Sequence, residues 1–259
     1  MRNLKFGIEL EVATKKSQRQ VVQALRDHGI DAVADRYGSQ VNHNQWKVQY
    51  DGSLNSGWEI VSPPITDTED LETVMFVLRK VIKAQGSPLT GLHIHHDIND
   101  FNLEQIKNLY SLYNKYEDNA IKSILRKQRI GNYYCKPISQ VVNNVQESNT
   151  IEEFKCSSNS RYHTLNNKAY IKYGTIEFRH HHGTTDVNEV MTWLHLTHKI
   201  VEAAQNGIDG NTSLQATTYE EALEELFEEI GVEDEKIMRL ARGRRRAIAK
   251  ADGRSERFA

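Results

Sequence analysis

Residues 4–12, LKFGIELEV, decide how the chain is interpreted, because apolar and polar side chains alternate along the whole stretch. The apolar positions are Leu4, Phe6, Ile8, Leu10 and Val12. A period of two is typical of a β-strand with one buried face, and it places Glu9 and Glu11 together on the opposite face. The sequence therefore predicts an early strand that carries two carboxylates on one side.

The remaining patterns predict a mixture of strands and helices without a regular βαβ order. Further strands are predicted at 46–50 and 57–62 around the turn Asp51-Gly52, at 91–98 and at 168–181. Helices are predicted from Ser17 to Gly29, over 71–82, after the Asn102…Gln105 capping box, after Asp186, and twice in the charged C-terminal part. This mixture favours an α+β fold, an antiparallel sheet with helices packed on one face.

The composition of the 259 residues is that of a globular protein, with 38% hydrophobic and 26% charged residues. No apolar run approaches the roughly 18 residues that a membrane span needs. The N-terminus lacks the apolar core of a signal peptide. Two cysteines, Cys135 and Cys156, are too few for a disulfide framework. We therefore expect a cytoplasmic protein.

Charge is concentrated near the C-terminus, although the net charge is only −2. Residues 220–235 carry nine acidic groups and no Lys or Arg, whereas residues 236–257 carry nine basic groups and two acidic ones. The basic cluster comprises Arg242, Arg244, Arg245 and Arg246. Such a cluster is able to contact nucleic acid or another polyanion, but a solvated helix beside its acidic neighbour, or a mobile tail, is the simpler interpretation. We divide the chain into a main domain, 1–207, and a charged helical extension, 208–259.

Polar side chains recur at alternate positions of three predicted strands. The pairs are Glu9 with Glu11, His93 with His95, and Glu177 with Arg179, while Asp51 and Glu59 lie on the predicted hairpin. A single pair of this kind is usually a solvent-facing stripe, because antiparallel sheets often keep one wet face. Their joint occurrence predicts one sheet face lined with carboxylates and imidazoles.

A sheet face so rich in carboxylates repels itself unless it recruits a cation. Oxygen donors with one or two nitrogens suit Mg²⁺ or Mn²⁺ better than Zn²⁺, and Mg²⁺ completes its shell with water and substrate phosphate. A nucleotide is therefore expected as well. Arg179 fits a phosphate clamp because its planar group binds phosphate oxygens in pairs. An ion pair with Glu177 is the structural alternative.

Two other stretches attract attention. In the run from His180 to His182, strand geometry separates neighbouring side chains, so we expect His181 near the site and the other two to be structural or exposed. Residues 130–160 are long and polar and match no motif, and we expect them to form a functional loop or lid and part of a substrate-specific wall. The chain has no P-loop, GxGxxG, GxSxG or HExxH motif.

Several short motifs, in their order along the chain, resemble those of the amidoligase family. They are FGIELE at 6–11, DGS at 51–53, EIVSPP at 59–64, GLHIHHD at 91–97, RYHTLN at 161–166 and TIEFRHHHGT at 175–184. Amidoligases are carboxylate–amine ligases similar to glutamine synthetase and glutamate–cysteine ligase, and many are encoded by phages and mobile bacterial operons. The resemblance, from about residue 4 to about residue 205, implies a glutamine-synthetase-like sheet. It also implies that ATP phosphorylates a carboxylate and that an amine attacks the acyl phosphate.

The resemblance implies a role for each candidate residue. The implied metal ligands are Glu9, His93 and Glu177 on the side of the ATP γ-phosphate, and Glu11 and Glu59 for a second metal, with Asp51 beside them. The implied catalytic and nucleotide-binding residues are His95 as a phosphate contact, Arg179 at the transferring phosphoryl group, and Arg161 as a nucleotide or substrate arginine, with Asn166 near it. ATP and Mg²⁺ or Mn²⁺ are the implied cofactors.

Three functions remain open at this point. The first is an ATP-dependent ligase whose acceptor is an amino acid, a peptide, a polyamine, a cell-wall precursor or a modified nucleobase. The second is a metal-dependent phosphohydrolase or nuclease, which would use the same acids without an arginine clamp. The third is a nucleic-acid-binding protein that acts through its basic C-terminus.

Overall fold

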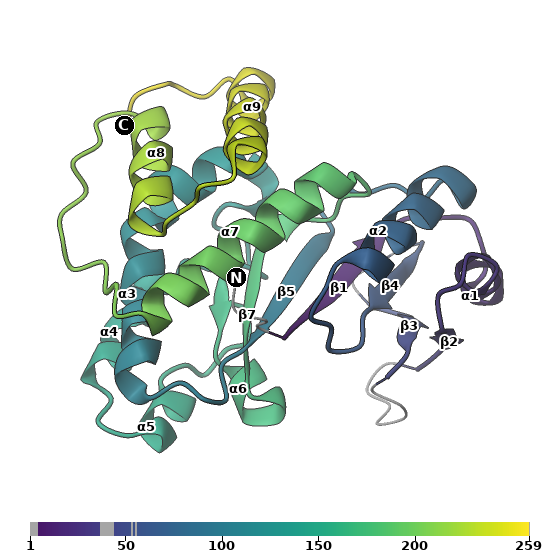
Figure 1. Ribbon diagram of the computed structural model, residues 1–259, viewed down its shortest axis with the longest axis horizontal. Helices are drawn as coiled ribbons and strands as arrows, with labels where there is room; N and C mark the ends of the chain where they lie inside the picture. Colours follow the sequence, from purple (N-terminus) through teal and green to yellow (C-terminus); the bar gives the residue numbers. More distant parts are fainter. Residues whose placement is uncertain (1–4, 37–43, 53, 55, 259) are drawn as a thin grey trace.

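A seven-stranded sheet in the order β2-β3-β4-β1-β5-β7-β6 forms the centre of the computed structural model, which describes residues 5–36, 44–52, 54 and 56–258 (Figure 1). The strands are β1 (Phe6–Val12), β2 (Ala32–Ala34), β3 (Trp46–Gln49), β4 (Trp58–Val61), β5 (Gly91–Asp97), β6 (Leu165–Asn166) and β7 (Thr175–His182). All neighbouring strands run antiparallel except β2 and β3. The predicted Leu4 of the first strand and Ser53 of the DGS motif lie outside the described residues.

The helices are α1 (Gln18–Arg26), α2 (Glu69–Phe76), α3 (Leu103–Tyr116), α4 (Val142–Glu147), α5 (Ile151–Cys156), α6 (Lys168–Tyr173), α7 (Val187–Gln205), α8 (Tyr219–Glu229) and α9 (Glu235–Asp252). The predicted caps Ser17, Asn102 and Asp186 begin α1, α3 and α7, whereas α4, α5 and α6 were not predicted as helices. At α3, the Asn102 side chain accepts from the backbone N–H of Gln105, whose side chain accepts from the N–H of Asn102. This reciprocal pair satisfies two N–H groups that would otherwise lack partners at the start of the helix.

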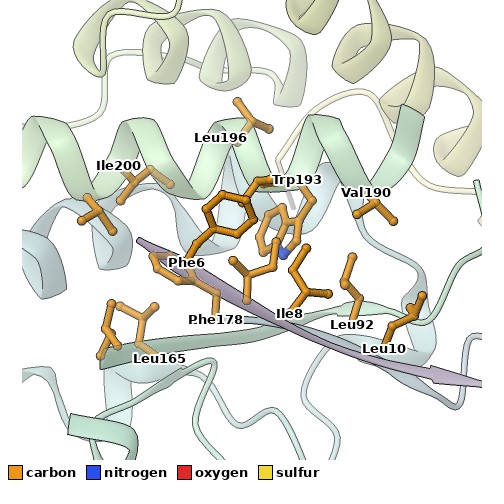
Figure 2. Close-up of a cluster of buried hydrophobic side chains, with 14 of the residues drawn as sticks. Phe6, Ile8, Leu10, Leu92, Leu165, Phe178, Val190, Trp193, Leu196 and Ile200 are labelled. Carbon is orange, nitrogen blue, oxygen red and sulfur yellow. The ribbon is translucent and has the colours of Figure 1, made fainter. Parts of the chain in front are cut away.

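The hydrophobic core lies between the sheet and the helices that cover one of its faces. The apolar positions of β1, including Ile8 and Leu10, point toward α7, and Trp193 of α7 reaches down among them (Figure 2). Phe178 of β7 is buried in the same layer. Each of these side chains contributes roughly 2–3 kcal/mol through burial. The α+β architecture is confirmed, and the face with alternating carboxylates is the one that α7 does not cover.

The two C-terminal helices neutralise each other's charge. In α9, Arg242 forms two 2.6 Å hydrogen bonds to Glu224 of α8, and Arg245 lies 2.7 Å from Glu220. Arg244 forms an ion pair with Glu189 of α7. Figure 1 shows α8 and α9 on the outer side of α7, away from the sheet. The arginine cluster therefore belongs to a helix beside its acidic neighbour.

Two segments differ from their sequence predictions. The alternating stretch 168–181 is not one strand: α6 occupies its first part and ends at Gly174, whose left-handed φ of 68° is the usual end of a helix. The strand β7 begins only at Thr175. Residues 130–160 contain α4 and α5 rather than a long irregular loop. No helix within the described ranges combines the length and the apolar character that a membrane span requires.

Candidate active site

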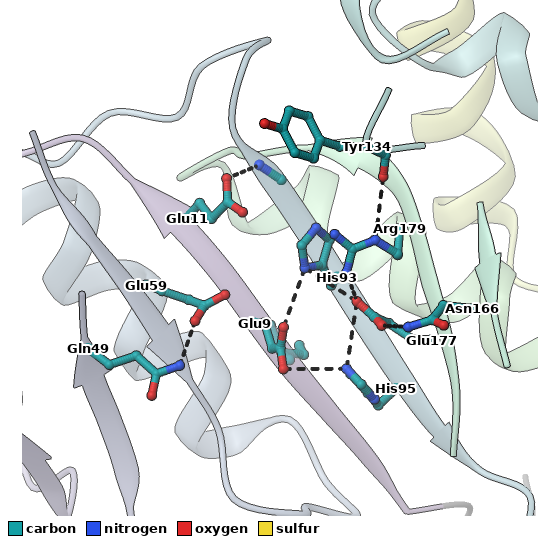
Figure 3. A network of polar contacts seen from close by, with 12 residues as sticks. Glu9, Glu11, Gln49, Glu59, His93, His95, Tyr134, Asn166, Glu177 and Arg179 are labelled. Carbon is teal, nitrogen blue, oxygen red and sulfur yellow. Dashed lines mark hydrogen bonds and ion pairs between the residues drawn. The ribbon is translucent and has the colours of Figure 1, made fainter. Parts of the chain in front are cut away.

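Strand pairing collects the polar positions of β1, β4, β5 and β7 on the face of the sheet that lies opposite α7. The residues that lie opposite one another are Glu9 with His93, Glu11 with Glu59, and His95 with Glu177. The apolar residues between them project to the other face, where the core lies. Residues from four separate parts of the sequence therefore form one continuous polar floor (Figure 3).

Glu9, His93 and Glu177 form the first cluster of potential metal ligands. His93 Nδ1 lies 3.4 Å from Glu9 Oε2 and 3.5 Å from Glu177 Oε1. One donor atom from each residue falls within 4.8 Å of the other two. Asn166 of β6 donates to Glu177 Oε2 at 2.5 Å, which fixes the orientation of that carboxylate.

Glu11 and Glu59 form a second cluster with the same His93. Their donor atoms also lie within 4.8 Å of one another. The backbone N–H of Gly91 donates to Glu11 Oε2 at 2.7 Å, and Gln49 of β3 donates to Glu59 Oε2 at 2.6 Å. Both carboxylates are thus held in place and buried, and His93 joins the two clusters.

His95 lies two residues after His93 on β5, so its side chain projects from the same face of the sheet. Its Nδ1 is 2.9 Å from Thr175 Oγ1, whereas its Nε2, 3.5 Å from Glu9 Oε1, is buried without a hydrogen-bond partner within the described part of the chain. Burial lowers the pKa of His95, but the carboxylates of Glu9 and Glu177 outweigh this effect and leave the pKa above its ordinary value. The polar atom without a partner therefore points into the site.

The carboxylates of the floor have opposite pKa shifts. Burial raises the pKa of Glu59, and repulsion from Glu9, Asp51 and Glu11 raises it further, well above its usual range. Burial also opposes ionisation of Glu9, but hydrogen bonds and charge from the two histidines hold its pKa well below the usual value. The pKa of Glu177 is lowered despite burial, chiefly by Arg179. Repulsion between carboxylates is therefore strongest on the Glu59 side of the floor.

Arg179 is fixed from several directions. Its guanidinium forms an ion pair with Glu177, and its Nε donates to the carbonyl oxygen of Tyr134 at 3.5 Å. Its own backbone N–H donates to Thr164 O at 2.9 Å, and Arg129 Nη2 donates to its carbonyl oxygen at 2.6 Å. The ion pair that the sequence offered as an alternative is therefore present, and it places the guanidinium beside the first cluster.

Three other candidates lie outside the two clusters. Asp51 lies just after β3, and repulsion from its carboxylate contributes to the raised pKa of Glu59. Arg161 has its guanidinium carbon 5.2 Å from the centre of the Tyr162 ring. Asn166 contacts Glu177, so it positions a ligand.

The expectation for His181 is wrong. A β-bulge lies between two pairs of facing residues: Leu92 faces His181, and Ile94 faces Phe178. The extra residue in β7 shifts the alternation by one position, which turns His181 to the covered face. There its ring lies 5.5 Å from that of Trp193. His180 and His182 are buried, as the structural alternative for them predicts.

The donor set fits a hard divalent cation. Four carboxylates and one shared imidazole match the oxygen-rich coordination that Mg²⁺ and Mn²⁺ favour. Repulsion at Glu59 is the electrostatic condition that a bound cation relieves. The residues present are therefore compatible with the metal that the motifs imply.

Residues 2–201 match the family model described as "putative amidoligase enzyme". The chain belongs to the amidoligase family. No curated protein matches it. The matched range contains every candidate residue, from Glu9 to Arg179, and excludes α8 and α9. The family places the chain among the ligases in general.

Several residues of this amidoligase site were not singled out in the sequence. Gln49 holds Glu59, Thr175 holds His95, and Arg129 binds the backbone of Arg179. Gln49 could have been predicted from the sequence, because the predicted hairpin around Asp51-Gly52 places it opposite the Glu59 region. Arg129 gave no such signal, because its segment carries no periodic pattern.

Proposed function

We propose that this amidoligase is an ATP-dependent carboxylate–amine ligase that forms an amide bond through an acyl phosphate. The observation that carries the proposal is a pair of acidic clusters that share His93 and lie beside the immobilised Arg179. Phosphoryl transfer depends on positioning and on neutralising charge, and this arrangement offers both. Because ATP is a cytoplasmic metabolite, the proposal includes a cytoplasmic location.

Two groups of residues would hold the metal ions. Glu9, His93 and Glu177 form the site nearer Arg179, and Glu11 and Glu59 form the second. Bound Mg²⁺ or Mn²⁺ supplies positive charge to the phosphate oxygens. The protein's own contribution is to fix three of these carboxylates: Asn166 donates to Glu177, Gln49 to Glu59, and the backbone N–H of Gly91 to Glu11.

Arg179 and His95 would act on the transferring phosphoryl group. The carboxylate substrate attacks the γ-phosphorus, the bond to the β-bridging oxygen breaks, and ADP leaves. Arg179 stabilises charge that spreads over the equatorial oxygens, because its guanidinium is held in place before the reaction. His95, with its raised pKa, offers an N–H to a phosphate oxygen.

The second half of the reaction forms the amide. The amine nitrogen attacks the acyl carbon, the carbon–oxygen bond to phosphate breaks, and inorganic phosphate leaves. The nitrogen then loses its proton to a base or to solvent. Arg161 and Asn166 are proposed to lie where nucleotide or substrate binds.

An ADP-release screen with mixed carboxylates and amines tests this function. With MgATP, we expect release only when a suitable acid and amine are both present, and no release from the Glu9→Gln variant. The exposed Glu233→Gln change is a matched control that should leave release unaltered. Release of ADP or phosphate that needs neither substrate would favour a metal-dependent phosphohydrolase instead.

A further inference from the structure

The site is bordered on one side by a surface rich in cations and aromatic rings. Residues 119–146 contain five Lys or Arg and residues 154–176 contain four, and neither segment contains Asp or Glu. The two segments are joined by hydrogen bonds: Lys136 N–H donates to Tyr162 O at 2.7 Å, and Thr164 N–H donates to Lys136 O at 2.9 Å. We call the surface formed by Tyr133, Tyr134, Lys136, Arg161 and Tyr162 the tyrosine wall.

Three tyrosine rings form the centre of this wall. The ring centres of Tyr133, Tyr134 and Tyr162 are 5.3–5.4 Å apart in all three pairs. Tyr133 is 63% exposed and Tyr134 is 49% exposed, so both present large areas of ring to solvent. Clustered aromatic rings that stay exposed are costly to leave in water and commonly mark a binding surface.

Cations lie over these rings. Lys136 Nζ is 4.8 Å from the centre of the Tyr133 ring, and the Arg161 guanidinium carbon is 5.2 Å from that of Tyr162. Within the part of the chain that the structure describes, Lys136 has no carboxylate within ion-pair distance. The Tyr133 ring therefore orients the positive charge of Lys136, which is available to an anion.

The tyrosine wall is continuous with the catalytic floor. The carbonyl oxygen of Tyr134 accepts from Arg179 Nε at 3.5 Å, and the Tyr162 ring centre is 5.8 Å from the Arg179 guanidinium carbon. Figure 3 shows Tyr134 next to Arg179, with Glu59 on the opposite side of the site. A ligand on the wall would therefore reach the arginine that faces the first cluster.

We propose that the tyrosine wall binds the carboxylate substrate, and that this substrate carries a second negative group beside an aromatic or apolar body. This inference rests on the proposed ligase function and deepens it. An anion that approached over Glu11 and Glu59 would meet like charge, whereas the wall offers the ammonium group of Lys136. The exposed rings of Tyr133 and Tyr134 supply the contact for the apolar part, which a small acid such as acetate would not use.

Three dipeptides separate the two halves of this prediction. Acetyl-Asp-Phe carries two carboxylates and a ring, acetyl-Asn-Phe lacks the second carboxylate, and acetyl-Asp-Ala lacks the ring. Calorimetry with the full chain should give acetyl-Asp-Phe an affinity roughly fivefold above that of either relative, the size expected for a partly exposed ion pair or an aromatic contact. The titrations are made both with and without magnesium and a non-hydrolysable ATP analogue.

Variants assign each preference to its residue. Lys136→Met should remove the preference over acetyl-Asn-Phe, and Tyr133→Ser should remove the preference over acetyl-Asp-Ala while Tyr133→Phe keeps it. These side chains are partly or largely exposed, so the fold should survive, and circular dichroism checks this. Lys250→Met, an exposed lysine on α9, is the matched control and should bind all three peptides as the unaltered chain does.

Three results would overturn the inference. They are absence of binding by all three peptides, equal affinity for all three, and preferences that persist in Lys136→Met and Tyr133→Ser. Aromatic rings among cations also suit single-stranded nucleic acid. If a fluorescein-labelled oligothymidylate bound the wall and displaced acetyl-Asp-Phe, the ligand of the wall would be a polynucleotide and not a small acid. The ligase proposal is tested separately by titrating MgATP without peptide: absence of MgATP binding would count against the ligase, whereas MgATP binding without peptide binding would count against the tyrosine wall alone.

Discussion

Replacing Glu59 by Gln should stabilise the metal-free protein and weaken its response to metal. Glu59 is buried in the floor, and its pKa is raised first by burial and then by repulsion from Glu9, Asp51 and Glu11. Glutamine has nearly the same shape, and its carbonyl oxygen still accepts from Gln49. The substitution therefore removes a charge and leaves the packing largely as it is.

The magnitude follows from the separation of the carboxylates. Donor oxygens of Glu59 and Glu11 lie within 4.8 Å. Two unit charges at that distance repel by about 3 kcal/mol at an effective dielectric constant near 20. Because its raised pKa lets Glu59 relieve part of this repulsion by binding a proton, we expect a gain below that figure, on the order of 1–2 kcal/mol, or roughly 2–8 °C in Tm for a chain of this size.

The sign of the pH dependence is fixed by the raised pKa. Below the ordinary value of 4.5, Glu59 is protonated in both the folded and the unfolded chain, so the wild-type protein carries no penalty there. The penalty grows as pH rises above that value, so the advantage of Glu59→Gln should be larger near pH ~8 than near pH ~5.

Thermal unfolding in EDTA and in excess Mg²⁺ measures both effects. In EDTA the variant should melt above the wild type, and in Mg²⁺ the wild type should gain more than the variant, because binding to the folded state alone raises its stability. The exposed Glu233→Gln change is the control and should shift neither Tm. A variant that melts well below the wild type in EDTA would mean that Glu59 is structural and that the repulsion argument is incorrect.

Three further changes test other parts of the account. Arg179→Lys should lower kcat by about 10²-fold or more with little change in ATP affinity, because lysine keeps the charge and loses the planar fork. Phosphate release at a near-wild-type rate in stopped flow would mean that Arg179 serves only as the structural ion-pair partner of Glu177. Burial raises the pKa of Glu117 from 4.5 to about 7, so Glu117→Gln should gain up to about 3 kcal/mol above that pH and nothing below 4.5; urea unfolding across pH would contradict this if the difference stayed constant. The double change Arg242→Gln and Arg246→Gln should leave binding of labelled duplex DNA unaltered in fluorescence anisotropy, since Arg242 already binds Glu224; a clear loss of binding would restore the polyanion role of the α9 cluster.

The sequence predicts those features of the fold that depend on local periodicity. The alternation in β1 places Glu9 and Glu11 on one face, and the Asp51-Gly52 turn predicts the β3–β4 pair. Each of these signals is set by residues close together in the chain, so a single sequence contains it. The floor of the site follows because all its strands obey the same period.

Features that depend on distant pairing were not visible. The bulge in β7 adds one residue against β5, and only that strand pair shows that His181 turns away from the site. Asn166 contacts Glu177 because β6 pairs with β7, and a two-residue strand has no detectable period. The stretch that became α6 alternates as a strand would, and its helical conformation depends on the left-handed Gly174 that follows.

The most direct test of the shared metal and nucleotide site is calorimetry with ATP on the wild-type chain and on Glu9→Gln. The account predicts that ATP binds the wild type with Mg²⁺ or Mn²⁺, that EDTA abolishes this binding, and that Glu9→Gln binds far more weakly although it stays folded. ATP binding that is equally tight in EDTA, or unchanged in Glu9→Gln, would contradict the account.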